Sequence, residues 1–487
     1  MDAKEKMVQA QAVQQAAALR RAGRWAEAEA AYARLLTRWP DLPDCWYNLG
    51  FVRTRLGQAQ GALKAYDEAL RRGVSGPEEV HLNRARLFAD YLRRNDEAER
   101  ALNAALACNR NYVPALLNLG NLQEDLGDRV GASASYQRAL DVDATCFEAL
   151  ARLINVKKSE QIDARDVGAL RAALVHPRAH IEDRASIGFA LGRALDARGD
   201  YDGAFAAYAE ANKASKLSAG QGQGVYDRAA HEALIDAIIA AFTAPVENET
   251  STPAPATFIC GMFRSGSTLL EQALGAHPRV TAGDELDLIP AIVRGEMAPF
   301  PGAMAKASPA GLEALSGRYR AQVAEMFPGA DLLTDKRPDN FLYIGLIKTL
   351  FPSAKIINTL RDPRDNCLSV FFLHLNHVMT YAFSLEDIAH YFMCYRRLMT
   401  HWKKLYPDDI FDFDYDAFVA APRETLAPVL QFLGLDWREE CLAFYTQKNS
   451  VKTASVWQVR QPLYAQSSGR WRHYEKHLGQ VRAMLGQ

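Results

Sequence analysis

The sequence has no excess of charge of either sign, no paired cysteine motif and no long hydrophobic run. Its 57 Lys and Arg residues balance 58 Asp and Glu residues, and a net charge of −1 argues against a chain whose main role is to coat nucleic acid. The seven cysteines are scattered, with neither a CxxC pair nor the spacing of metal ligands, so we expect reduced, buried thiols and no metal site. No segment approaches the about 20 apolar residues that span a bilayer, which predicts no membrane span.

The N-terminal segment also lacks a targeting signal. The first residues, MDAKEKMVQAQAVQQAA, have no basic start followed by an apolar core, so we expect no secretory signal and a cytoplasmic protein. The composition is ordinary for a globular chain, with 49% hydrophobic and 24% charged residues, which excludes a largely disordered or collagen-like protein. A length of 487 residues predicts two or three domains.

A pattern of small and aromatic residues recurs along the first half of the chain. The order is glycine, glycine, alanine, tyrosine and alanine, and it occurs at Gly50, Gly57, Ala62, Tyr66 and Ala69, at Gly120, Gly127, Ala132, Tyr136 and Ala139, and at Gly192, Gly199, Ala204, Tyr208 and Ala211. Successive occurrences lie two units of about 34 residues apart, which is the unit length of tetratricopeptide (TPR) repeats. The recurrence favours a helical repeat array over a generic helical bundle.

Each repeat unit is expected to form two antiparallel helices. Small residues at the positions of Gly50 and Ala62 allow the helices to approach closely, and Gly57 forms the turn between them. Tyr66 is expected to face the groove and the neighbouring unit. Stacked units form a superhelix whose concave face commonly holds a peptide or a protein. We therefore predict a TPR superhelix with a connecting helix over residues 1–242, and a polypeptide partner on its concave face.

A second domain is expected after a linker. Residues 243–256 are polar and rich in proline, as is typical of a linker, and the second domain then covers residues 257–487. Residues 257–261 form an apolar run that predicts a buried parallel strand, and residues 269–276 predict a helix. The loop between them, GMFRSGST, is bounded by glycine, and its backbone N–H groups together with the helix N-terminus favour an anion.

This loop differs from the nucleotide-triphosphate loop GxxxxGK[ST] at one position that matters for chemistry. Ser267 stands where that loop has the lysine that reaches the β- and γ-phosphates, so ATP or GTP hydrolysis is disfavoured. Arg264 supplies a cation earlier in the loop, and a short anion such as a phosphosulfate suits this arrangement. A nucleotide kinase that uses the Gly261 loop is the alternative enzyme.

The loop and the residues after it resemble a known family. The motifs RSGST at 264–268, HP at 277–278 and GDE at 283–285 are similar to the 5′-phosphosulfate loop and following segment of sulfotransferases that use 3′-phosphoadenosine 5′-phosphosulfate (PAPS). They resemble above all the protein-tyrosine sulfotransferases and the TPR-fused sulfotransferases of bacteria. The resemblance implies a P-loop-like α/β domain with a parallel central sheet after the TPR superhelix, and PAPS as co-substrate without a metal. It also implies phosphosulfate binding by the loop residues Arg264, Ser265, Gly266, Ser267 and Thr268.

A second motif extends the resemblance. Residues 354–365 (AKIINTLRDPRD) predict a strand over 355–360 and a helix whose first turn holds Pro363. In the family, residues at the positions of Arg361 and Ser369 bind the 3′-phosphate that distinguishes PAPS from ATP. The resemblance implies the same role for these two residues here.

The late segment 455–471 resembles the family's loop that closes over the nucleotide. By this resemblance Ser455 approaches the sulfuryl group, while Gln458 and Arg470 bind the cofactor, Arg470 at its 3′-phosphate. Tyr415 lies in FDFDYD, a predicted late strand, and resembles the aromatic residue that contacts the adenosine side.

The resemblance also implies a base. Sulfuryl transfer needs a group that takes the proton of the acceptor hydroxyl, and the family position for this group is Glu285. Asp284 is the competing candidate, and His374 and His377 are weaker ones, because lone histidines are more often structural.

Fixed cations must hold the sulfate oxygens and the departing phosphate, and no metal is required when Arg and Lys side chains supply that charge. Lys336 matches the family's lysine that stabilises the transition state, and its neighbour Arg337 is the alternative cation. Arg264 is expected to bridge the 5′-phosphate and the transferring group.

The predicted reaction moves a sulfuryl group from PAPS to an acceptor hydroxyl. The acceptor is open between a protein tyrosine and a carbohydrate or other small hydroxyl compound, and the oligomeric state is open as well. A non-catalytic TPR scaffold with a nucleotide-binding domain is the alternative from a different class of protein.

Overall fold

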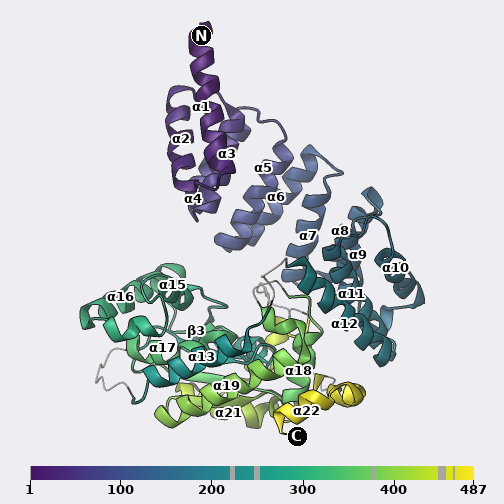
Figure 1. Cartoon of the computed structure of the whole chain (residues 1–487), viewed down its shortest axis with the longest axis vertical. Helices are drawn as coiled ribbons and strands as arrows, with labels where there is room; N and C mark the ends of the chain where they lie inside the picture. Colours follow the sequence, from purple (N-terminus) through teal and green to yellow (C-terminus); the bar gives the residue numbers. More distant parts are fainter. Residues whose placement is uncertain are drawn as a thin grey trace. The chain divides into compact units, whose positions relative to one another are not determined.

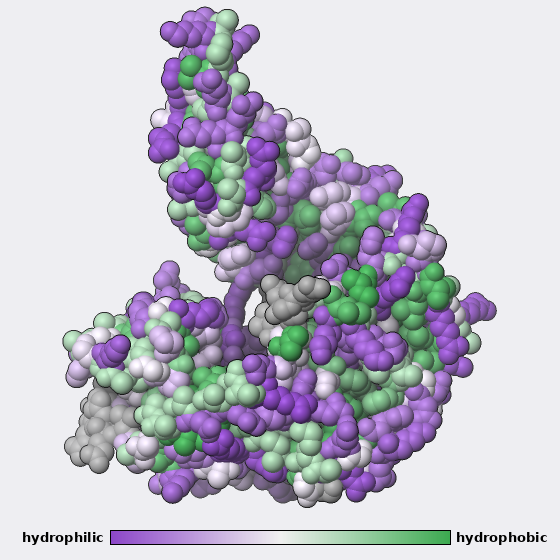
Figure 2. Space-filling view, viewed as in Figure 1, coloured by the Kyte–Doolittle hydropathy of each residue, from purple (hydrophilic) through white to green (hydrophobic). Residues whose placement is uncertain are grey.

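A computed structural model describes residues 2–219, 225–245, 253–375, 379–447, 457–463 and 467–486. The chain divides into two compact units, Met1–Lys158 and Ser159–Gln487 (Figure 1). Within the described ranges, every helix is too short or too polar to cross a bilayer. Figure 2 shows hydrophilic residues interspersed with hydrophobic ones over the visible face of each unit, as expected for a chain with 24% charged residues.

The first unit consists of helices that pack in sequential antiparallel pairs, visible as successive hairpins in Figure 1. Its α-helices are α1 (Ala3–Arg21), α2 (Trp25–Arg38), α3 (Pro43–Arg55), α4 (Ala59–Arg71), α5 (Pro77–Arg86), α6 (Asn95–Cys108), α7 (Val113–Asp125), α8 (Arg129–Val142) and α9 (Phe147–Val156). This arrangement confirms the predicted helical repeats.

The first glycine of each repeated pattern lies against the tyrosine of its own hairpin. A Cβ atom on Gly50 would come within 2.6 Å of the Tyr66 ring, and one on Gly120 within 2.4 Å of the Tyr136 ring. Only glycine permits this approach, which explains why the two residue types recur together. Tyr66 is therefore 1% exposed and buried between α3 and α4, so the expectation that it faces the groove is wrong.

The second unit opens with further helices, namely α10 (Ala164–Leu174), α11 (Ile181–Ala197), α12 (Tyr201–Ser218) and α13 (Arg228–Ala241). The α11–α12 hairpin repeats the glycine–tyrosine contact through Gly192 and Tyr208. Helix α12 also packs on the α/β domain, where the same Tyr208 ring stacks on Phe372 at 4.1 Å and Asn212 donates a hydrogen bond of 2.8 Å to the Phe371 carbonyl. The compact unit thus begins ahead of the domain boundary predicted at residue 242.

A five-stranded parallel sheet lies at the centre of the second unit, in the order β2-β3-β1-β4-β5. Its strands are β1 (Thr257–Gly261), β2 (Val280–Ala282), β3 (Leu332–Lys336), β4 (Ile356–Leu360) and β5 (Ile410–Asp414). The sheet confirms the predicted fold class and the strand predicted over 257–261. The strand order changes direction beside β1, and ligands of such sheets bind outside the carboxyl ends of the strands at this switch point.

The helices around the sheet are α14 (Ser267–Gly275), α15 (Leu288–Arg294), α16 (Pro309–Met326), α17 (Ile344–Leu350), α18 (Pro363–Phe371), α19 (Leu385–Leu405), α20 (Tyr415–Ala420), α21 (Pro422–Leu433) and α22 (Gly479–Leu485). Two of them differ informatively from expectation. The helix predicted over 269–276 begins at Ser267, directly after the glycine loop. Tyr415 does not continue the late strand, because the Asp414 side chain accepts the Ala417 N–H and starts a helix there.

Candidate active site

The loop after β1 is fixed on β4 by hydroxyl groups. Ser265 Oγ and Thr359 Oγ1 lie 2.6 Å apart, and Thr359 also donates a hydrogen bond of 3.0 Å to the Cys260 carbonyl. Gly266 is the residue before α14, has a φ of +100°, and a Cβ there would come within 2.6 Å of the Tyr415 ring. The loop therefore directs its N–H groups and the N-terminus of a nine-residue helix toward the same space, as an anion site requires.

Two arginines from different strand ends meet at this loop. Arg264 donates hydrogen bonds from Nε to Ser369 Oγ at 3.1 Å and from Nη2 to Gln458 Oε1 at 2.8 Å. Arg361, at the end of β4, donates from Nη1 to the Arg264 carbonyl at 3.2 Å and lies 4.9 Å from the centre of the Tyr415 ring. Four of the residues predicted to bind the nucleotide, namely Arg264, Arg361, Ser369 and Gln458, are thus brought together.

Both arginines line an open pocket of about 680 Å³, counting space that is open to solvent, whereas Ser369 is not among its lining residues. Among its lining residues are Arg264, Gly266, Ser267, Thr268, Glu285, Arg361, Tyr415 and Gln458. A charged rim with an aromatic wall is suited to an anionic nucleotide.

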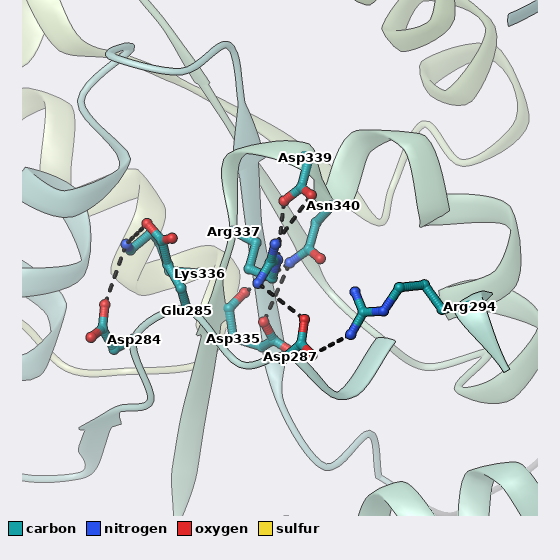
Figure 3. A network of polar contacts seen from close by, with 9 residues as sticks. All are labelled: Asp284, Glu285, Asp287, Arg294, Asp335, Lys336, Arg337, Asp339 and Asn340. Atoms are coloured by element: carbon teal, nitrogen blue, oxygen red, sulfur yellow. Dashed lines mark hydrogen bonds and ion pairs between the residues drawn. The ribbon is translucent and has the colours of Figure 1, made fainter. Parts of the chain in front are cut away.

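A lysine–glutamate pair lies at the edge of the pocket, drawn on the left of Figure 3. Lys336 ends β3 with a fully buried side chain, and its Nζ donates to Glu285 Oε1 at 2.8 Å and to Asp284 Oδ1 at 3.4 Å. Burial lowers the pKa of Lys336, but three surrounding carboxylates raise it by more, so the net shift is upward and the ammonium stays charged. Glu285 is 42% exposed and reaches the pocket, whereas Asp284 is not among the pocket's lining residues.

Arg337 points away from this pair. Its guanidinium donates to Asp339 at 3.1 Å and lies 3.8 Å from Asp287, which also pairs with Arg294 (Figure 3). Arg337 is therefore engaged in a separate ion-pair network, and Lys336 is the cation that contacts the predicted base.

Comparison with known proteins identifies the parts of the chain. Residues 255–439 match the model of the sulfotransferase family. This segment is a sulfotransferase-family domain. Residues 13–77 and 115–148 match models of the tetratricopeptide repeat, which confirms the predicted TPR array.

Three relatives illustrate the similarity. An uncharacterized protein of Aquifex aeolicus (strain VF5) is 32% identical over 414 residues, which cover 82% of this chain and 52% of the relative. Protein-tyrosine sulfotransferase 2 of Gallus gallus is 27% identical over 216 residues, covering 40% of this chain and 56% of the relative. The chain thus spans about half the length of both relatives. The solved sulfotransferase domain from the Synechococcus PCC 7002 olefin synthase is 22% identical, with a TM-score of 0.37, over 47% of this chain and 90% of that structure.

Other predicted residues of the sulfotransferase domain lie elsewhere. Arg470 does not line the pocket, because its guanidinium pairs with Asp196 at 2.7 Å and covers the Phe372 ring at 5.2 Å. His374 stacks on Phe189 at 5.1 Å, which is a packing role. The expectation that Arg470 approaches the 3′-phosphate is therefore corrected. Ser455 and His377 lie outside the described residues.

Two buried carboxylates of the sulfotransferase domain were missed in the sequence. Asp365, in α18, accepts the backbone N–H groups of Gly469 and Trp471, and so determines the direction in which Arg470 leaves the chain. Glu271, in α14, accepts from the Thr334 hydroxyl and from a backbone N–H beside the base. The sequence feature that could have indicated Glu271 is a charged residue within the otherwise uncharged segment LLEQAL of the predicted helix.

Proposed function

We propose that this protein transfers a sulfuryl group from PAPS to an acceptor hydroxyl and releases adenosine 3′,5′-bisphosphate. The observation that carries the proposal is the convergence of three groups on one pocket: the glycine loop with Arg264, Arg361 from the neighbouring strand end, and Glu285, whose carboxylate accepts a hydrogen bond from the buried Lys336 behind it. Cations and N–H groups together with a carboxylate match a reaction that handles a nucleotide with an anionic group at each end and a hydroxyl proton.

In the proposed reaction each residue has a defined task. The loop amides and Arg264 bind the phosphosulfate, while Arg361 and Ser369 bind the 3′-phosphate. Glu285 accepts the proton of the acceptor hydroxyl while the hydroxyl oxygen forms a bond to sulfur. The bond between sulfur and the bridging phosphate oxygen breaks, and its electrons leave with the nucleotide. Lys336 stabilises the charge that develops on the sulfate oxygens.

Three further roles belong to this proposal. Tyr415, which lies against Gly266 and beside Arg361, is suited to contact the adenosine side. Gln458 contacts the Arg264 guanidinium and borders the nucleotide site. The approach of Ser455 to the sulfuryl group stays a prediction, as does a cytoplasmic location.

A protein tyrosine is the acceptor that we favour. Its support is the similarity to relatives named protein-tyrosine sulfotransferase and the presence of repeats of a kind that binds polypeptides. A carbohydrate or another small hydroxyl compound is the second candidate. A nucleotide kinase has less support, because Ser267 occupies the position of the phosphate-reaching lysine.

Replacement of Glu285 by glutamine is expected to lower kcat about 10²-fold, because the amide cannot accept the hydroxyl proton. The measurement is transfer of ³⁵S from labelled PAPS to lysate protein, followed by hydrolysis to identify tyrosine sulfate. Binding of adenosine 3′,5′-bisphosphate, followed by thermal shift, should be unchanged.

Asp284→Asn is the matched control, since asparagine tolerates the φ of +61° at this position. We expect this variant to retain most of its activity. Loss of transfer in Asp284→Asn with normal transfer in Glu285→Gln would reverse the assignment of the base. Stabilisation by ATP with Mg²⁺, and none by adenosine 3′,5′-bisphosphate, would favour the kinase instead.

A further inference from the structure

A buried carboxylate lies behind the Lys336–Glu285 pair. Glu271 projects from α14, the helix that begins at the phosphate loop, and the residue is 1% exposed. Its Oε1 accepts a hydrogen bond of 2.8 Å from Thr334 Oγ1 on β3 and one of 3.0 Å from the backbone N–H of Asp284. One oxygen thus connects the phosphate-loop helix, the strand that ends in Lys336 and the turn that carries Glu285.

An ionisable group at this place needs a compensating partner. The buried residues of α14 include Leu270, Ala273 and Leu274, and Glu271 is the ionisable one among them. Burial raises the pKa of Glu271 to about 7, against the opposing attraction of Lys336, and the Asp284 carboxylate adds to the rise. Lys336 is the cation that faces Glu271, and it faces Asp284 and Glu285 as well.

The turn that Glu271 contacts has an unusual backbone. Asp284 has a φ of +61°, a conformation that non-glycine residues seldom adopt without support. The N–H of Asp284 donates to Glu271, and the carbonyl of Asp284 accepts a hydrogen bond of 3.1 Å from the backbone N–H of Lys336. The N–H of the preceding residue, Gly283, donates to the Thr334 carbonyl at 3.1 Å. These contacts fix the direction in which the next residue, Glu285, leaves the chain.

We propose that Glu271 is a positioning residue for sulfuryl transfer, which holds the Asp284–Glu285 turn through a backbone N–H and keeps the Lys336 ammonium directed at Glu285. The inference rests on the proposed function. Because Glu271 belongs to the helix that follows the phosphate loop, it also links the anion site to the base. It does not line the pocket and therefore does not touch the nucleotide.

The test compares Glu271→Gln with Glu271→Leu. Glutamine keeps an oxygen acceptor but loses the charge, and we expect kcat to fall about 10-fold with the KM for PAPS within about twofold. Leucine loses the acceptor as well, and we expect a fall of about 10²-fold. Since Glu271 raises the pKa of Lys336, the loss of activity at high pH should begin at lower pH in Glu271→Gln.

Tyr319→Phe is the matched structural control. It removes the 2.7 Å hydrogen bond to the buried Asp335 carboxylate, which neighbours Lys336 on the opposite face of β3. We expect this variant to lose thermal stability and to keep both kcat per folded molecule and the pH profile. A second readout, independent of activity, is hydrogen exchange of the peptide that contains Asp284, which should be faster in Glu271→Leu than in the parent protein.

The outcomes separate the two proposals. If the parent protein transfers no sulfate, the proposed function fails and this inference fails with it. If the parent protein is active and Glu271→Gln matches it in kcat and in the pH at which activity is lost, only the positioning role is overturned. A fall in kcat with an equal fall in Tyr319→Phe would likewise overturn it, because a general loss of rigidity would then explain both.

Discussion

Replacement of Lys336 by methionine is expected to lower kcat for sulfuryl transfer about 10³-fold, because the buried cation that donates a hydrogen bond to Glu285 is lost. Methionine has a similar length and adapts to irregular space, so the packing beneath β3 is retained. Initial rates with labelled PAPS measure the effect. The affinity for adenosine 3′,5′-bisphosphate should change little, since the phosphate-binding arginines remain.

The same replacement should destabilise the fold in a pH-dependent way. Without Lys336, the buried Glu271 carboxylate loses the positive charge whose attraction opposes the rise of its pKa, so its ionised form becomes less stable in the folded protein. The folded-state pKa of Glu271 is already raised to about 7, above that of the unfolded chain, so stability is lost as the pH rises through this window. Thermal denaturation should therefore show a larger deficit at pH 8 than at pH 6.

A second buried lysine provides the control. Lys348 is 2% exposed, and its Nζ donates to Asp409 at 2.9 Å and to the Ala354 carbonyl at 3.2 Å. Lys348→Met should reduce stability and leave kcat per folded molecule unchanged. Normal kcat in Lys336→Met combined with a large loss in Arg337→Met would instead identify Arg337 as the acting cation.

Local patterns predicted much of the fold. The run at 257–261 became β1 because every residue in it is buried, and Pro363 begins α18 as its fixed backbone angle favours. The recurring glycine and tyrosine positions likewise follow from contacts within single hairpins, such as Gly50 with Tyr66. The helix start and the hairpin contacts depend on neighbours that are close in sequence. The strand β1 is revealed by its apolar run, because a strand paired on both sides, here by β3 and β4, is apolar throughout.

Features that depend on distant contacts were not predictable. Arg470 turns toward α11 because Asp365, more than a hundred residues earlier, binds the amides on both sides of it. Glu271 acquires its environment only when β3 and the 283–285 turn close over α14. The start of a helix at Tyr415 is an exception, since Asp414 is a helix-capping residue that the sequence displays.

Arg361→Ala is expected to weaken binding of adenosine 3′,5′-bisphosphate about 10³-fold, which corresponds to the loss of two charge-assisted hydrogen bonds of about 2 kcal/mol each. The proposed target of Arg361 is the 3′-phosphate, so binding of AMP, which lacks that group, should change far less. Titration calorimetry with both nucleotides measures the preference of the parent protein for the bisphosphate. The variant should lose most of this preference, and the preference of the parent protein should diminish with added salt.

Arg364→Ala is the matched control for this variant. Arg364 lies three residues after Arg361, in the first turn of α18, pairs with Asp362 and covers the Trp471 ring at 3.7 Å, outside the pocket's lining residues. Arg364→Ala removes one positive charge, as Arg361→Ala does, from a position close to Arg361 in the sequence. A general electrostatic effect would therefore appear in both variants. Only a direct contact predicts that Arg361→Ala loses the preference for the bisphosphate while Arg364→Ala keeps it. Equal losses in the two variants, or an unchanged preference in Arg361→Ala, would show that Arg361 does not bind the 3′-phosphate.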